Sequence, residues 1–238
     1  MDNVTYTTLA RQSGLLSDMS TVAQNISNMS TTGYRAERVV FSEFVVDLGP
    51  GEDSLSMART TARSSDASQG ALRQTNGSLD LAIEGDGFFM VETASGPRLT
   101  RAGAFSASGD GLLVAPDGAP VLDAGQAAIF LPPNVTEIAI AADGTLSADG
   151  QPLAQVGLFR PIDPTSPTRA ESTRFDPGGA VEPADTGRIL QGFLETSNVD
   201  AVSEIARMIE VQRAYELGQT FLDREDERIR ATIRTTGQ

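Results

Sequence analysis

The 238-residue sequence contains no cysteine, no histidine and no tryptophan, and all 18 of its basic residues are arginine. Without cysteine and histidine there is no Ser-His-Asp or Cys-His nucleophilic site and no usual set of zinc ligands, and without lysine there is no Schiff base. Any chemistry would have to come from carboxylates, hydroxyls, arginine and the backbone. The absence of cysteine fits an oxidising compartment, where stray thiols would be a liability, but it does not establish one.

Excess positive charge is missing as well. The net charge is -14 and the sequence pI is about 4.3, so we expect neither nucleic acid nor an anionic membrane surface as a partner. No apolar run approaches 18 residues, which excludes a membrane-spanning helix by sequence. The N-terminus shows no basic segment followed by an apolar core, so we expect any export to avoid a cleaved signal peptide.

The N-terminal region carries apolar residues at helical spacing between residues 9 and 29. Asp18 is the one charge between Gln12 and Tyr34, and most other polar positions are Ser, Thr, Asn or Gln. These residue types are weak helix formers, so the helix needs partners. The low charge indicates that its polar side also meets protein, and Gly33 is a plausible residue to end it. The apolar residues at helical spacing are Leu9, Leu15, Leu16, Met19, Val22, Ala23, Ile26 and Met29.

The C-terminal region predicts a long amphipathic helix that follows a capping-box-like start at Ser197 and Asp200. Apolar residues seven positions apart over three heptads favour coiled-coil packing, although a single helix lying on its own domain remains an alternative. The repeat runs through Met208, Tyr215, Leu222 and Ile229, with Val211 and Gly218 between its members, and Val202, Ile205 and Ile209 widen the face at the start.

Between the ends the apolar period changes to two, and five Asp-Gly pairs punctuate the chain. We therefore predict an α+β protein with an all-β central domain inserted between two terminal helices that pack together as a coiled-coil-like assembly domain. The expected divisions are an N-terminal assembly helix in 1–35, an extended connector in 36–70, a β-rich domain in 71–195 and a C-terminal assembly helix in 196–238. Within the β domain, 161–187 reads as a mobile Pro-rich excursion.

The stretch "LDLAIEGDGFFMVET" places three carboxylates in a run that otherwise reads as buried strand. Asp-Gly after an alternating strand predicts a tight turn, which explains Asp86 without chemistry. The spacing of a calcium-binding loop is absent. Asp80 and Glu84 lie four apart on one predicted strand and could serve a cell-wall hydrolase, which needs two nearby carboxylates. We expect the turn, and no catalytic residue, metal or cofactor.

Three ordered motifs make the sequence recognisable: "VAQNISNMSTTGYRAERVVF" near the start, "GSLDLAIEGDGFFMVET" with "LTRAGAFSASGDGLLVAPDGAPVL" in the middle, and "LETSNVDAVSEIARMIEVQRAYE" near the end. Together they resemble the bacterial flagellar rod and hook family. The length and the "MDNVTYT" opening resemble a proximal-rod member more than a distal-rod member, which stays the alternative. The resemblance implies a structural subunit of the basal body that spans the periplasm.

The resemblance also implies how such a subunit works. Terminal helices of neighbouring copies would pack as the inner wall of a tubular axis, with copies of itself and other rod proteins as partners. The chain would leave the cell through the flagellar type III export apparatus, and the terminal helices would stay frayed until assembly. The assembly interface is expected at Leu16, Met19, Ala23, Asn25, Ile26, Asn28, Gly33, Tyr34, Asn198, Val202, Ile205, Met208, Ile209, Gln212, Arg213, Tyr215, Leu222 and Ile229.

The rival interpretations belong to other classes. A periplasmic wall hydrolase would use Asp80 and Glu84. A secreted adhesin or binding module would tolerate an acidic, cysteine-free β domain, but it leaves the paired terminal helices unexplained. Nothing in the sequence indicates a small-molecule substrate.

Overall fold

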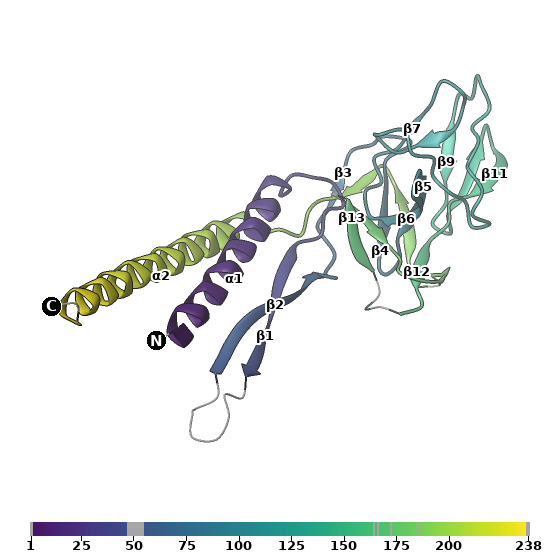
Figure 1. The fold of residues 1–238 in the computed structure, drawn as a ribbon. Helices are drawn as coiled ribbons and strands as arrows, with labels where there is room; N and C mark the ends of the chain where they lie inside the picture. Colours follow the sequence, from purple (N-terminus) through teal and green to yellow (C-terminus); the bar gives the residue numbers. More distant parts are fainter. Residues whose placement is uncertain are drawn as a thin grey trace. The chain divides into compact units, whose positions relative to one another are not determined.

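Helices occupy the two ends of the chain and strands the region between them, so the protein is α+β (Figure 1). The computed structural model describes residues 2–46, 55–163, 165, 167–171, 173–184 and 186–236. The chain divides into two compact units. Unit 1 contains residues 1–27, 36–66 and 200–238, and unit 2 contains residues 28–35 and 67–199.

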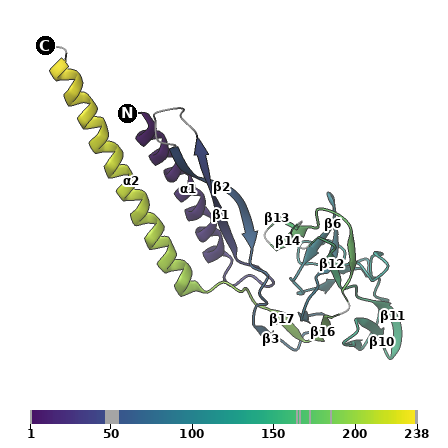
Figure 2. The same cartoon turned by 90° about the horizontal axis from the view of Figure 1, so that it is seen from below.

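Unit 1 combines both helices with a β-hairpin. Helix α1 spans Asp2–Ser27 and helix α2 spans Ala201–Thr236, while β1 (Glu37–Val46) pairs antiparallel with β2 (Leu55–Ser65). Figure 2 shows α1 beside the hairpin and α2, and α1 contacts all three of these elements. Packing against α2 and the hairpin explains the low charge on the face of α1 that is buried in unit 1, because buried ions are costly.

The hairpin corrects the expectation for residues 36–70, which we predicted as an extended connector. The run "ERVVFSEFVV" is rich in β-branched and aromatic residues, which favour a strand, whereas the Ser, Gly and Asp around it had favoured a connector. The register runs from Glu37 opposite Ser65 to Val46 opposite Leu55, with an irregularity between Val40 and Phe41.

The helix ends also differ from the prediction. Helix α1 begins at Asp2 and ends at Ser27, so Gly33 does not terminate it. Gly33 has a φ of 68° for another reason: a Cβ there would lie 2.3 Å from the backbone nitrogen of Ala102. Helix α2 is capped by Asp200, whose Oδ1 accepts a hydrogen bond of 2.7 Å from the Ser203 amide, whereas Ser197 Oγ accepts one from the Val199 amide.

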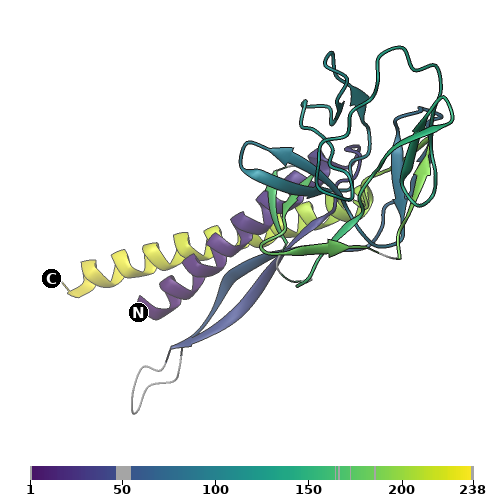
Figure 3. The same ribbon diagram turned by 90° about the vertical axis from the view of Figure 1, so that its right-hand side faces the viewer.

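Unit 2 holds the remaining strands, which all lie between residues 72 and 195 (Figure 3). Their order in the sheets is β13-β14-β6-β5, β11-β10-β9, and the pairs β12-β15, β16-β4, β17-β3 and β7-β8. The strands are β3 (Leu72–Gln74), β4 (Leu81–Glu84), β5 (Phe89–Thr93), β6 (Gly96–Thr100), β7 (Ser106–Ala107), β8 (Leu113–Val114), β9 (Ile138–Ile140), β10 (Thr145–Ala148), β11 (Gln151–Gln155), β12 (Phe159–Pro161), β13 (Thr168–Glu171), β14 (Arg174–Asp176), β15 (Val181–Pro183), β16 (Arg188–Gln191) and β17 (Phe193–Glu195).

The larger hydrophobic core of unit 2 gathers side chains from β4, β5, β8, β9, β10 and β16, including the fully buried Leu81, Phe89 and Ile189. A second cluster surrounds Met90 and Phe175. Phe175 lies in the Pro-rich range 161–187, so the part of that range around Phe175 packs in the core instead of forming the excursion we predicted. Strands β13 and β14 pair within it and β14 continues the sheet to β6, so Phe175 takes part in the core, whereas Ile162 is 60% exposed.

Four of the five Asp-Gly pairs lie in turns, and at the fifth, Asp86-Gly87, the chain bends. Every one of their glycines has a positive φ, from 79° at Gly150 to 116° at Gly87. At the β10–β11 hairpin the aspartate also has a positive φ, 49° at Asp149, which is the geometry of a type I′ turn. At Asp86 and Gly87 the chain bends between β4 and β5, but β4 pairs with β16 and β5 pairs with β6, so this pair forms a bend rather than the tight hairpin turn that the pattern predicted.

Candidate assembly interface

The outer face of α1 exposes a row of apolar side chains. Leu9 and Leu16 are each 50% exposed, and Ala23, a further seven residues along, is exposed as well. We call Leu9, Leu16 and Ala23 the α1 stripe. The opposite face of the helix is inside unit 1, where Val22 is buried. Seven-residue spacing places one residue on the same side every two helical turns, which is the pattern of a coiled-coil seam.

The start of α2 exposes a second row, which we call the α2 ridge and which consists of Val202, Ile205 and Ile209. Their exposed fractions are 77%, 51% and 43%. The heptad residues of α2 differ from them, because Val211 is buried and the rest are partly buried. The heptad face thus packs within unit 1, while the ridge is left to solvent in the single chain.

Polar contacts fix the antiparallel pairing of α1 and α2. Arg207 Nη2 contacts the carboxylate oxygens of Asp18 at 3.1 and 3.3 Å. Asn25 donates to the Glu37 carbonyl (2.9 Å) and to Glu204 Oε2 (3.2 Å), and its Oδ1 accepts from the Glu37 amide. The one charge in the middle of α1 is therefore paired, and the buried Asn25 amide ties α1 to both α2 and β1.

The predicted interface residues fall into three groups by their exposure in the single chain. The buried group is Asn25, Gly33 and Tyr34. The partly buried group is Met19, Ile26, Asn28, Asn198, Met208, Tyr215, Leu222 and Ile229. The exposed group is Leu16, Ala23, Val202, Ile205, Ile209, Gln212 and Arg213.

Four members of that prediction, Asn28, Gly33, Tyr34 and Asn198, lie in unit 2 rather than in unit 1 with the helices. The guanidinium of Arg169 stacks 4.4 Å from the centre of the Tyr34 ring. Asn198 donates from its backbone to the Tyr34 carbonyl and from its side chain to the Ser68 carbonyl. These two residues therefore hold together the segments where the chain enters and leaves unit 2.

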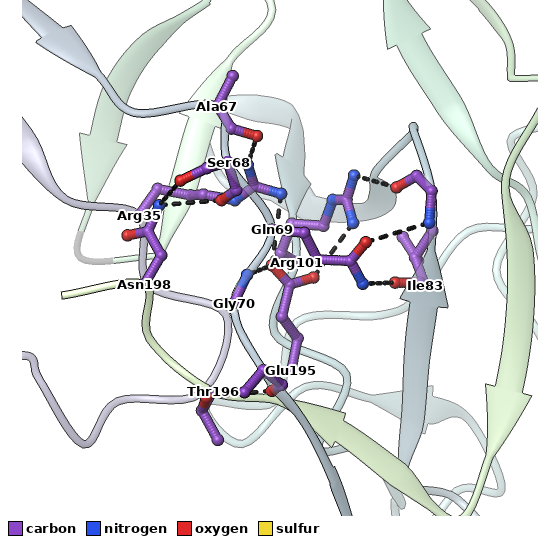
Figure 4. Close-up of polar contacts among 12 residues, drawn as sticks. Arg35, Ala67, Ser68, Gln69, Gly70, Ile83, Arg101, Glu195, Thr196 and Asn198 are labelled. Carbon is purple, nitrogen blue, oxygen red and sulfur yellow. Dashed lines mark hydrogen bonds and ion pairs between the residues drawn. The ribbon is translucent and has the colours of Figure 1, made fainter. Parts of the chain in front are cut away.

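A buried ionic cluster joins the same segments (Figure 4). The carboxylate of Glu195, 1% exposed, lies 3.3 Å from Arg35 Nη2 and 3.1 Å from Arg101 Nη1, and both arginine side chains are 4% exposed. Glu195 Oε1 also accepts a hydrogen bond from the Gly70 amide at 3.1 Å. The Gly33 amide donates to the Glu195 carbonyl at 2.8 Å. We call Glu195, Arg35 and Arg101 the Glu195 cluster.

The arginines of the Glu195 cluster are also bonded to the backbone. Arg101 Nη2 donates to the Gly85 carbonyl at 2.8 Å, and Arg35 donates to the Ala67 carbonyl. Burial lowers the pKa of Arg101, and the nearby Glu195 carboxylate opposes that shift. Arginine titrates so far above neutrality that it keeps its charge, so two buried cations share this one carboxylate. The cluster couples residue 35, residue 101 and the last strand of unit 2.

Sequence reasoning missed the Glu195 cluster, because its members are separated by 66 and 94 positions along the chain and follow no local pattern. The available signal was weak: Glu195 directly follows the apolar pair Phe193 and Leu194, and a carboxylate in such a strand needs a partner if it faces the core.

The acidic residues that prompted the hydrolase interpretation have structural partners. Arg188 donates a hydrogen bond to Glu84, which lowers the pKa of that carboxyl, whereas a general acid needs a raised pKa. Asp80 accepts a hydrogen bond of 2.6 Å from Thr75 Oγ1. Within the described ranges no group of three or more acidic residues is arranged to hold a metal ion, and neither helix is long and apolar enough to cross a membrane.

Comparisons with known proteins agree with the sequence motifs. Residues 82–148 match the family model of the flagellar hook protein FlgE/F/G D1 domain, and residues 190–235 match that of the flagellar basal body rod FlgEFG protein C-terminal region. The flagellar basal-body rod protein FlgF of Caulobacter vibrioides is 34% identical over 100% of this chain and 99% of its own length. FlgF of Rhizobium meliloti is 37% identical (93% and 92%), and FlgG of Bacillus subtilis is 28% identical (93% and 94%).

Proposed function

The chain belongs to the flagellar FlgE/F/G family of hook and rod proteins, and we propose that it is a FlgF-type subunit of the basal-body rod that assembles through exposed faces of α1 and α2. Identities of 34 to 37% with three FlgF proteins, against 28 to 31% with the FlgG proteins, favour the proximal-rod over the distal-rod position. Its partners would be other copies of itself and neighbouring rod proteins.

The observation that carries the proposal is the unsatisfied apolar surface of the helices. The α1 stripe and the α2 ridge expose five large aliphatic side chains by 43 to 77%. Full burial of each such side chain contributes about 1.5–3 kcal/mol, so covering both rows supplies a driving force of several kcal/mol for association. Aligned rows on helices favour helical partners, and on this basis we propose coiled-coil-like packing between copies.

The residues of the predicted interface then divide into two roles. The exposed members, such as Leu16 and Val202, would contact neighbours directly. The buried members, such as Asn25, would position the helices within the subunit through the hydrogen bonds given above. A drive shaft needs packed interfaces rather than catalytic groups, and the pairing of Glu84 with Arg188 supports a non-enzymatic role.

We further propose that the protein reaches the basal body through the flagellar type III export apparatus, as its family membership suggests. Ser, Thr and Asn dominate the polar positions of α1, and they lower its intrinsic helix stability. A helix of this composition depends on tertiary and intersubunit contacts, so the terminal helices would become fully stable only on assembly.

The test is incorporation of a Leu16→Glu variant into basal bodies. Leu16 is half exposed, so the charge leaves the single chain folded but puts an unpaired carboxylate into the assembled interface. In a strain lacking the native gene, we expect the variant to be made and exported but absent from purified basal bodies.

The matched control is Leu153→Glu, which makes the same change at a 40% exposed leucine of β11 in unit 2. We expect this variant to enter basal bodies at the wild-type level. Normal incorporation of Leu16→Glu, or equal loss of both variants, would contradict the assignment of the interface to the helices.

A further inference from the structure

A groove runs between α1 and α2 inside unit 1 and has a volume of about 390 Å³. Thr8, Arg11, Gln12 and Leu15 of α1 and Ala214, Leu217, Gly218 and Phe221 of α2 line it. Each set follows the spacing i, i+3, i+4 and i+7. This is the set of four neighbouring positions that forms a hole for one inserted side chain in coiled-coil packing. The two helices thus present holes to the same groove.

The floor of the groove is fixed by a glutamine that packs against a glycine. Gln12 is 5% exposed, and its Nε2 donates to the Tyr215 carbonyl at 3.0 Å. A Cβ on Gly218 would lie 2.3 Å from that nitrogen, so a larger residue here would displace the Gln12 amide from this position. Gln12 Oε1 has no hydrogen-bond partner in the part of the chain that the structure describes. A buried acceptor without a donor is satisfied if an occupant supplies one.

The walls of the groove are apolar and open. Leu217 is 71% exposed and Phe221 is 43% exposed. Of the residues that line the groove, Arg11 alone is charged. The groove therefore suits a helix that presents apolar side chains flanked by uncharged hydrogen-bond donors.

The chain carries such a helix face itself. The α1 stripe places Leu9, Leu16 and Ala23 at two-turn intervals, with the exposed hydroxyl residues Ser13 and Ser20 beside them as uncharged donors. Asp18, the one charge in the middle of α1, is turned inward and paired with Arg207, so the stripe brings no charge with it. The α2 ridge fits less well, because the charged Arg213 follows Ile209 by one helical turn on the same face.

We propose that the groove between α1 and α2 receives the α1 stripe of a second copy of this chain. This inference rests on the proposed function and names the surfaces that meet. Leu15, in the groove, and Leu16, in the stripe, point about 100° apart around α1, so groove and stripe are different surfaces of one subunit. A contact between two different surfaces is heterologous, and it repeats without closing on itself unless the rotation brings it round into a ring.

Cysteine cross-linking tests this pairing cleanly, because the chain has no cysteine of its own. One chain carries Leu217→Cys and the other carries Leu16→Cys, and both are expressed together in a strain lacking the native gene. A disulfide between them can form only between two copies. Leu9→Cys and Ala23→Cys extend the scan along the stripe, Val202→Cys probes the ridge, and Leu153→Cys is the control outside the helices. Phe221→Cys replaces Leu217→Cys if the latter enters basal bodies poorly.

We expect oxidation of purified basal bodies to give a mixed disulfide between position 217 and at least one stripe position, and none with position 153. A maleimide should also label Leu217→Cys at least about tenfold more slowly in basal bodies than in the monomer, because assembly covers the groove. Unchanged labelling would overturn the inference. Slower labelling together with a disulfide to position 202 would also overturn it. The same holds for slower labelling without a disulfide to any stripe position, because another occupant would then fill the groove.

Failure of the proposed function gives a separate result. In that case the wild-type protein itself would be missing from basal bodies, and the inference would fall with it. If the inference alone is wrong, the protein is present in basal bodies and the groove cysteine stays reactive or pairs elsewhere.

Discussion

Replacing Glu195 with glutamine removes the negative charge that faces two buried guanidinium groups. Breaking a buried ion pair by neutralising one partner costs about 3–5 kcal/mol, because the other charge stays buried without compensation. Glutamine keeps the shape and one acceptor oxygen, so the change isolates the charge. A whole domain is stable by about 5–15 kcal/mol, and we therefore expect Glu195→Gln to remove a large share of the stability of unit 2.

The assay is native-state hydrogen exchange on the full-length monomer, followed at the amides of β5 and β6. A loss of about 3–5 kcal/mol speeds exchange about a hundredfold to several thousandfold, since each 1.4 kcal/mol is a factor of ten. Glu182→Gln is the matched control, because it breaks an exposed pair with Arg160 and should cost about 0–1 kcal/mol.

A double substitution sharpens the test. Adding Arg101→Met to Glu195→Gln removes one of the two unpaired cations. The double variant should therefore be destabilised by less than the sum of the two single variants, with a coupling energy of about 0.5–3 kcal/mol. Exchange in Glu195→Gln within tenfold of the wild type, or strictly additive costs, would refute the claim that the Glu195 cluster holds the entry and exit of unit 2 together.

Three further predictions concern individual elements. In chemical denaturation, Gly33→Ala should destabilise unit 2 more than Gly118→Ala. Both substitutions impose about 1–2 kcal/mol of left-handed strain, but only at position 33 would the new Cβ lie 2.3 Å from a backbone atom, the nitrogen of Ala102. Equal losses of stability would contradict this prediction. The hydrogen bond from Arg174 lowers the folded-state pKa of Asp117, so the pair stabilises the fold above the unfolded pKa near 3.9, and that contribution is lost as the pH falls through the folded-state value. Asp117→Asn should therefore show a shallower stability loss in acid titrations, and parallel curves would disprove the assignment. In the dilute monomer, the amides of residues 9–29 should exchange faster with solvent than those of β5. Equal protection would contradict the proposal that α1 becomes fully stable only on assembly.

The sequence was sufficient for the features that depend on local pattern. The seven-residue spacing of Met208, Tyr215 and Leu222 located α2, and four of the five Asp-Gly pairs located turns, because periodicity and positive φ are properties of neighbouring residues. The change from helical to alternating period likewise located the β-rich region.

Features set by distant partners could not be read in this way. The hairpin of β1 and β2 is an example, because it packs against α1, which lies earlier in the chain, and no pattern within residues 36–70 reveals that partner. Asn25 is predicted at the assembly interface, and the partners of its amide within unit 1, Glu37 and Glu204, lie 12 and 179 positions away and follow no local pattern. The cap of α2 is Asp200 and not Ser197, because three-residue spacing alone does not determine which hydroxyl or carboxylate accepts hydrogen bonds from the free amides.

The most direct test of the central claim is electron microscopy of basal bodies purified from a strain that lacks this gene. If the protein is a rod subunit, the rod should be missing or stop short. The full-length chain should restore it, whereas a chain carrying Leu16→Glu should not. Complete rods in the deletion strain would contradict the account, because a subunit of the drive shaft cannot be dispensable for building it.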